Sequence, residues 1–186
     1  MAHLQFSGEL RDTEQAISLW RQKASEFGRP PPAAAVNLSQ MNGDGFRFVI
    51  CADMLVEEDS AFVLYGANFA KLLDLPERPL MNVPMIKQLP KRYHSLFADG
   101  CSEAINEAAP VRFSGETEYC GDTELYRATF MPLKMEAPNH RLIYGSFNYC
   151  TGQSVGFSEG FQRAQWRPME VVEGRRLSGQ GFVLSV

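Results

Sequence analysis

Residues 111–150 restrict the fold of this chain most, because polar and apolar residues alternate through them with the period of an extended backbone. From Val111 to Tyr119, apolar or small residues alternate with polar ones at every position. That is the pattern of a half-buried β-strand. Two more segments rich in apolar and aromatic residues, 125–135 and 141–150, follow after short turn-forming stretches. We therefore expect three strands joined by short loops, in an antiparallel meander.

The preceding part of the chain adds strands and helices to this meander. Segments 46–54 and 60–66 are typical of two strands joined by a turn, and 67–75 has a short helical pattern that Pro76 ends. Residues 93–108 place apolar side chains on one face of a longer helix. Because the helices fall between two groups of strands, we expect an α+β fold with a five-stranded antiparallel sheet and helices on one face.

A further helix is expected at 13–27, with Asp12 and Thr13 as capping candidates and Gly28 as its end. Its apolar residues recur at helical spacing: Ile17, Trp20, Ala24 and Phe27. Segment 141–150 is apolar on both of its faces, so the outer face of the sheet needs a cover. This helix is the nearest candidate, from the same chain or from a partner chain, and we expect it to promote a homodimer.

Composition excludes several classes of protein. The 186 residues are 45% hydrophobic, which is enough for one sizeable core. A net charge of -4 and the lack of a basic cluster argue against binding to nucleic acid. No segment approaches the roughly 20 apolar residues that span a bilayer, and the first residues do not resemble a secretory signal, so we expect a cytoplasmic protein without a membrane partner. The four cysteines form no C-x-x-C pair and are expected to be reduced.

The order of these elements resembles that of the PAS domain family. The resemblance covers residues 45–150 and rests on "FVLYGANFAKLLDLP", "VRFSGETEY", "YRATFMPLKM" and "RLIYGSFNYC". It is closest to small stand-alone bacterial PAS-like proteins, in which a Trp-Arg helix, here Trp20 and Arg21, and a Gly-Arg-Pro segment, here Gly28 to Pro30, precede the domain. Residues 1–44 are then an N-terminal helical extension and linker, and 151–186 a C-terminal tail.

The resemblance implies a sensory or protein-interaction module without catalytic activity, which passes its signal to a separate regulatory protein. Its pocket would lie between the helices and the inner face of the sheet, and would take a small apolar or aromatic ligand. The expected lining residues are Phe48, Ile50, Tyr93, Phe97, Cys101, Phe113, Tyr119, Phe130 and Phe147. Two alternatives stay open: a small α+β enzyme that uses the same cavity, and a purely structural dimerisation module with a filled core.

No cofactor or metal is expected. His94 and Cys101 lie two helical turns apart, and a helical histidine is a haem ligand in some members of the PAS family. No second ligand is spaced to help, however, so we interpret His94 as a capping or rim residue and Cys101 as a small buried side chain. Gly66 and Asp74 replace the asparagine and glycine that many PAS domains carry there, which argues against a flavin. The tail either docks on a domain or becomes ordered on a partner.

Overall fold

The computed structural model describes residues 3–38, 45–55, 59–80, 82–119 and 122–152, together with two short segments at 165–166 and 182–183. Much of the C-terminal tail, and with it the hypothesis that the tail docks or orders on a partner, lies outside the described residues. The backbone of the two short segments forms strands β6 (Gln165–Trp166) and β7 (Phe182–Val183), which pair antiparallel with each other.

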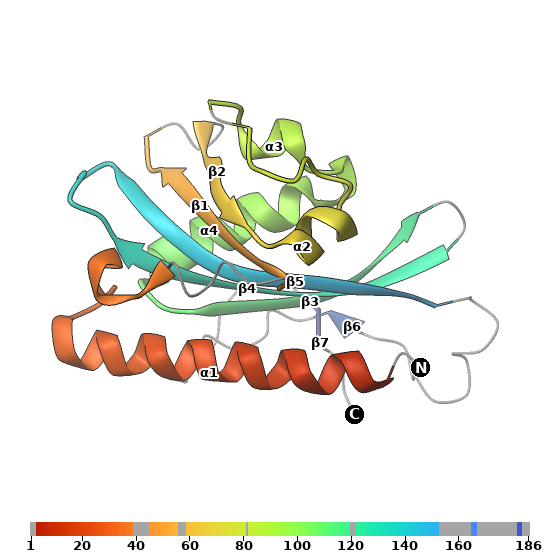
Figure 1. Ribbon diagram of the computed structural model, residues 1–186, viewed down its shortest axis with the longest axis horizontal. Coiled ribbons are helices and arrows are strands. Elements are labelled where there is room, and N and C mark those ends of the chain that lie inside the picture. Colours follow the sequence, from red (N-terminus) through yellow and green to blue (C-terminus); the bar gives the residue numbers. More distant parts are fainter. Residues whose placement is uncertain are drawn as a thin grey trace.

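A five-stranded antiparallel sheet forms the centre of the molecule, with the strand order β2-β1-β5-β4-β3 (Figure 1). Its strands are β1 (Arg47–Asp53), β2 (Ala61–Tyr65), β3 (Val111–Tyr119), β4 (Asp122–Lys134) and β5 (His140–Gly152). The three last strands form the expected meander, because each pairs with its neighbour in the chain. Strand β1 then pairs with β5, which joins the first hairpin to the meander.

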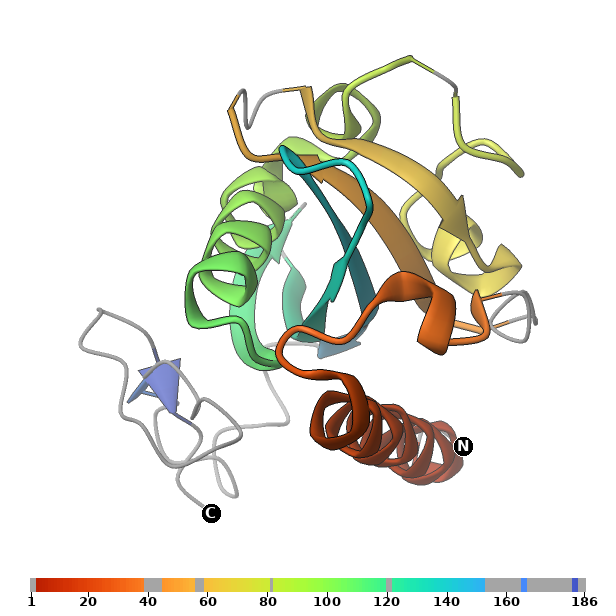
Figure 2. The same cartoon turned by 90° about the vertical axis from the view of Figure 1, so that its left-hand side faces the viewer.

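The helices lie on both sides of this sheet. They are α1 (His3–Phe27), the short 3-10 helices η1 (Ala33–Ala35) and η4 (Lys91–Tyr93), α2 (Ala67–Leu72), α3 (Met85–Gln88) and α4 (His94–Glu107). Helices α2, α3 and α4 cover the inner face, and α1 runs along the opposite, outer face (Figures 1 and 2). The expected α+β arrangement, with helices on one face and a separate N-terminal helix, is therefore confirmed at this level.

Two separate hydrophobic clusters follow from this layering. Ile143 and Phe147 of β5 belong to the inner cluster, whereas Leu142 and Tyr144 belong to the outer one. Side chains point alternately to the two faces of a sheet along a strand. Because β5 is apolar at both sets of positions, both faces of the sheet bury apolar side chains. The outer face is covered by a helix of the same chain, which decides between the two sources that the sequence left open.

Helix α1 differs from its predicted form at both ends. It begins at His3 rather than near Thr13, so the prediction that Asp12 and Thr13 cap the helix is wrong. The Thr13 hydroxyl instead lies 3.3 Å from the hydroxyl of Ser146 on β5. At the other end Phe27 is 60% exposed and does not pack on the sheet. The helix ends there because Gly28 adopts a φ of 93°, a left-handed conformation that commonly ends helices.

The remaining predicted residues of α1 do pack on the outer face. Ile17, Trp20 and Ala24 are buried. Their cluster also contains Val36, Val49, Met131, Leu133, Leu142 and Tyr144. At the edge of this cluster, the indole N–H of Trp20 donates a buried hydrogen bond of 2.7 Å to the carbonyl oxygen of Pro132. Trp20 therefore gives α1 a polar as well as an apolar contact with the sheet.

The hydrogen bond from Trp20 to Pro132 lies at the end of β4 that extends beyond β3. Strand β3 pairs with β4 only as far as Phe130, so the carbonyl of Pro132 falls beyond that pairing. Proline also lacks an N–H to offer a neighbouring strand, which suits a strand position at an edge. Two residues further on, the N–H of Lys134 donates to the carbonyl of Pro31 at 2.8 Å. The N-terminal extension therefore takes over the edge of β4 that β3 leaves.

Replacing Trp20 by phenylalanine tests this role, because the change keeps an aromatic ring but removes the N–H donor. We expect Trp20→Phe to lower the free energy of unfolding by about 1–2 kcal/mol, since the buried Pro132 carbonyl loses its partner. Leu19→Ala is the control: Leu19 is 40% exposed on the same helix, and its change should cost less than about 0.5 kcal/mol. Equal losses in urea denaturation would contradict the assigned role of the hydrogen bond.

Candidate functional site

The residues predicted to line a pocket lie together on the inner face. Those buried in one cluster are Phe48, Ile50, Tyr93, Phe97, Cys101, Phe130 and Phe147. Phe113 is half-buried against the same cluster. Tyr119 belongs to β3, but its side chain lies outside the described part of the chain. The sequence thus identified residues that share one location, although they come from β1, β3, β4, β5, η4 and α4.

At its centre this aromatic cluster is closely packed. The ring of Phe48 has its centroid within 5.1–5.4 Å of the rings of Phe69, Phe97 and Phe130. A Cβ atom added at Gly100 of α4 would lie 2.3 Å from the Phe130 ring, and one at Gly145 of β5 would lie 2.3 Å from the Phe48 ring. Glycine is therefore required where α4 and the strands approach each other. The centre is a set of rings in direct contact.

One end of the cluster is more open and more polar. Tyr126 of β4 and Tyr149 of β5 are opposite each other in the sheet and are both half-buried. Their rings lie 5.8 Å and 6.1 Å from the ring of Tyr93. We call Tyr93, Tyr126 and Tyr149, with Glu124 and Arg92, the tyrosine end of the core. The hydroxyl of Tyr149 donates to the carbonyl of Leu72 on α2 at 3.3 Å.

A buried ion pair holds the tyrosine end together. Glu124 is only 2% exposed. One of its oxygens accepts hydrogen bonds from Nε of Arg92 at 2.6 Å and from the Tyr93 hydroxyl at 2.7 Å, and the other accepts from Nη2 of Arg92 at 3.1 Å. Burial raises the pKa of Tyr93 well above its usual range, and the hydrogen bond to the Glu124 carboxylate raises it further. The phenol therefore stays protonated and acts as a donor.

Sequence reasoning did not identify Arg92, Glu124, Tyr126 or Tyr149 as site residues. A signal was present for Glu124, because it lies in register with the inward-facing residues Tyr126, Ala128 and Phe130 of β4. A carboxylate at an inward position of a strand is costly unless a cation or donors compensate it. Arg92, by contrast, gives no signal in the sequence, because it lies in a short segment between two helices.

His94 and Cys101, the two residues considered for a haem site, both have structural partners. Nε2 of His94 lies 3.0 Å from the carbonyl oxygen of Leu89, so the ring is tied to the turn that precedes α4. Cys101 is 2% exposed and packs in the inner cluster. Both positions agree with the interpretation of a rim histidine and a small buried thiol. The described residues contain no group of three or more side chains of the kinds that bind metals placed to hold an ion.

Helix α4 carries three carboxylates along one side, Asp99, Glu103 and Glu107, at successive spacings of four residues. Burial raises the pKa of Glu103, and the neighbouring charges of Glu107 and Asp99 raise it further. Burial also raises the pKa of Tyr126, with Asp99 as the second cause.

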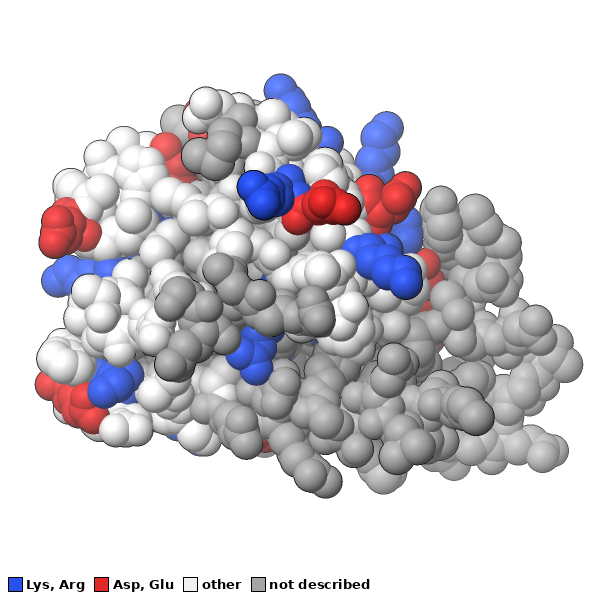
Figure 3. Space-filling model, viewed as in Figure 1, with Lys and Arg blue, Asp and Glu red and all other residues white. Residues whose placement is uncertain are grey.

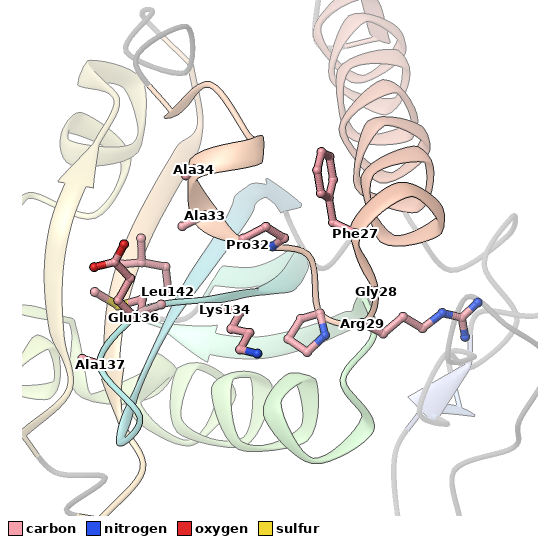
Figure 4. A pocket seen from close by; sticks show the side chains of 12 residues that line it. Phe27, Gly28, Arg29, Pro32, Ala33, Ala34, Lys134, Glu136, Ala137 and Leu142 are labelled. Carbon is pink, nitrogen blue, oxygen red and sulfur yellow. The ribbon is translucent and has the colours of Figure 1, made fainter.

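A second concave region lies on the other side of the molecule, where α1 ends (Figure 4). It is a groove of about 960 Å³ between Phe27, the segment that follows α1 and the β4–β5 turn. Its other lining residues are Gly28, Arg29, Pro30, Pro32, Ala33, Ala34, Lys134, Met135, Glu136, Ala137 and Leu142. We call it the helix-end groove. Exposed Phe27 therefore borders a largely apolar hollow instead of the sheet.

Neither the surface charge on the face shown nor the comparisons with known proteins indicates a function. On the face shown in Figure 3, Lys and Arg side chains are interspersed with Asp and Glu side chains. In the part of the chain that the structure describes, no helix combines the length and the apolar character needed to cross a membrane. No family model and no curated protein matches the sequence.

The carboxylates of α4 should make the stability of the protein depend on pH. Because the pKa of Glu103 is raised in the folded chain, its contribution to stability is full below its unfolded pKa, about 4.3, and is lost as the pH rises through the folded value. Glu103→Gln should therefore stabilise the protein at pH 7 and have no effect near pH 3. The gain is about 0.5 kcal/mol, since each like-charge pair costs a few tenths and solvent screens the exposed part.

Thermal unfolding of both proteins across this pH range measures the effect. Glu77→Gln, in the exposed loop after α2, is the matched control and should change the melting temperature at neither pH. A stabilisation by Glu103→Gln that is the same at pH 3 and pH 7 would show that repulsion along α4 is not its cause.

Proposed function

We propose that this protein is a PAS-like sensory or protein-interaction module without catalytic activity, which acts in bacterial regulation through a separate partner protein. The observation that carries the proposal is the enclosed aromatic cluster between α4, α2 and the inner face of an antiparallel sheet. This is where the resemblance to PAS domains puts the pocket for a small molecule. The groups that meet there are mainly hydrocarbon and phenol, which suit binding more than proton transfer or nucleophilic attack.

The backbone at Asp74 supports the resemblance. Many PAS domains have glycine at this position, and Asp74 adopts a φ of 53° just after α2. That left-handed conformation favours glycine and is tolerated by aspartate better than by most other residues. The departure from the family pattern thus changes the residue without changing the turn. Gly66, by comparison, has an ordinary φ of -77° at the start of α2.

The tyrosine end is less completely buried than the centre of the cluster. The central rings are fully buried and in contact with each other, whereas Phe113, Tyr126 and Tyr149 are half-buried. Half-buried aromatic rings beside hydrogen-bonding groups are typical of small-molecule sites. We therefore assign the expected apolar or aromatic ligand to this end. The close packing of the centre favours, as the alternative, a structural dimerisation module whose core holds no ligand.

A thermal-shift screen of small aromatic and acyl compounds tests ligand binding. We expect some compounds to raise the melting temperature of the wild type, and Phe113→Ala to change which compounds do so. The control is Val49→Ala, which removes side-chain volume from the outer cluster and should lower the melting temperature without changing the order of the compounds. If no compound stabilises the wild type and native mass spectrometry shows only the bare chain, ligand sensing is wrong and the structural module remains.

The proposed partner includes a second copy of the chain, bound through α1. Leu19 and Phe27 are 40% and 60% exposed on this helix, while Ile17, Trp20 and Ala24 are buried against the sheet. The exposed pair lies two helical turns apart on one side of α1. A homodimer that packs α1 of one protomer near the helix-end groove of the other would cover Phe27.

Phe27→Glu tests this dimer, because a carboxylate in an apolar contact between protomers would have to be desolvated. We expect light scattering to show a dimer for the wild type and a folded monomer for Phe27→Glu. Val63→Glu is the matched control, since Val63 is 50% exposed on β2 and the change introduces the same charge. A wild type that is monomeric at high micromolar concentration would contradict the proposed dimer.

A further inference from the structure

The Glu124 carboxylate lies at a built polar site inside an otherwise apolar core. It is 2% exposed, and its three hydrogen bonds come from two nitrogens of Arg92 and from the Tyr93 hydroxyl. A carboxylate removed from water in this way is strongly destabilising unless a cation stays beside it. Any rearrangement at this site must therefore keep a positive charge against Glu124.

The cation that now pairs with Glu124 lies between the carboxylate and solvent. The Arg92 side chain is 17% exposed, whereas the Glu124 side chain is 3% exposed. Arg92 belongs to η4, a single turn of 3-10 helix that follows Pro90. A long, flexible side chain on a short turn can leave its partner by rotation about its own bonds, without movement of α4 or of the sheet.

One aromatic ring contacts this charge directly, and two more pack against that ring. The guanidinium carbon of Arg92 lies 4.8 Å from the centre of the Tyr93 ring, which is a cation–π distance. Tyr126 and Tyr149 approach the same ring at 5.8 Å and 6.1 Å. Beside Tyr126, the paired position on β3 is Gly115, which adds no side chain. A buried carboxylate beside an aromatic face on which a guanidinium already stacks is a chemical arrangement that selects organic cations.

We propose that Glu124 and the three tyrosines form a receptor for the guanidinium or primary ammonium group of a small ligand, and that Arg92 occupies this receptor in the ligand-free chain. The exchange replaces one cation by another, so Glu124 stays paired throughout. An apolar or aromatic ligand that displaced Arg92 without carrying a cationic group would leave a buried charge without its partner. The inference rests on the proposed binding of a small ligand at the tyrosine end and specifies the chemistry of that ligand.

In this proposal Arg92 also lowers the apparent affinity of the receptor for its ligand. A ligand must compete with a side chain that is covalently attached and always nearby, so its apparent affinity falls by the fraction of time that Arg92 is displaced. Removing the guanidinium while keeping the fold should therefore strengthen binding of an added cation. Displaced Arg92 would also become more exposed, which gives the ligand-bound state a different surface beside the start of α4.

The experiment measures binding of methylguanidinium by isothermal titration calorimetry and by thermal shift, at constant ionic strength. Wild type, Arg92→Gln, Arg92→Lys, Glu124→Gln and the control Arg78→Gln are compared, since Arg78 is an exposed arginine elsewhere on the surface. We expect Arg92→Gln to bind at least about tenfold more tightly than the wild type. At ten times Kd its melting temperature should rise by about 3–6 °C.

The variants also show which side chain binds the added methylguanidinium. Arg78→Gln should respond like the wild type, and Glu124→Gln should not respond, because it lacks the charge that holds the cation. Arg92→Lys keeps a charge beside Glu124 and protects against loss of folding, but an ammonium group cannot form the same two-pronged contact. Methylguanidinium should therefore bind this variant more tightly than the wild type.

Two results would overturn the inference. One is that folded Arg92→Gln and Arg92→Lys bind methylguanidinium no more tightly than the wild type or the Arg78→Gln control. The other is an equal response in Glu124→Gln. Neutral aromatic compounds that stabilise the wild type while methylguanidinium binds none of the Arg92 variants would refute only the cationic specificity, and would leave the proposed ligand-sensing function standing.

Discussion

The constraint on which this structure depends is that a single sheet is apolar on both faces. In β5 the inward residues Ile143 and Phe147 and the outward residues Leu142 and Tyr144 are all buried, so neither face can be left to water. The inner face is covered by α2, α3 and α4, which the chain inserts between β2 and β3. The outer face is covered by α1, which precedes every strand. The N-terminal extension is thus a structural part of the core.

The contact of α1 with the outer face depends on β4 being longer than its pairing with β3. Strand β4 runs to Lys134, whereas its pairing with β3 stops at Phe130. The exposed edge that results has polar backbone groups that require partners. The Trp20 indole satisfies the carbonyl of Pro132, and Pro31 accepts from the N–H of Lys134. One segment therefore buries apolar surface and completes an incomplete edge of the sheet.

Most of this architecture could be predicted from the sequence, because it follows from periodicity. The alternation from Val111 to Tyr119 identified β3, and the apolar stripe of Ile17, Trp20 and Ala24 identified the buried face of α1. The ends of α1 were harder to predict from the sequence. The helix begins at His3, and its last residue, Phe27, is exposed. A helical spacing shows which residues share a face but not where the surface beneath that face ends.

The candidate site was predictable only in its apolar part, for a related reason. Phe48, Phe97, Phe130 and Phe147 fall at inward positions of strands and a helix, and such positions come together in any packing of these elements. The ion pair of Arg92 and Glu124 joins residues separated by 32 positions. Which cation meets an inward carboxylate depends on the path of the η4 segment, and no local pattern fixes that path.

The central aromatic rings and the buried ion pair contribute differently to the molecule. The central rings give the core its volume and much of its stability, since burial of apolar area is the main favourable contribution to folding. A buried ion pair contributes little net stability, because the desolvation of both charges offsets their attraction. Its value is specificity, because Glu124 accepts only an arrangement that includes a cation. The ion pair therefore adds little net stability but restricts the conformation of the tyrosine end, because loss of either partner would leave a buried charge unpaired.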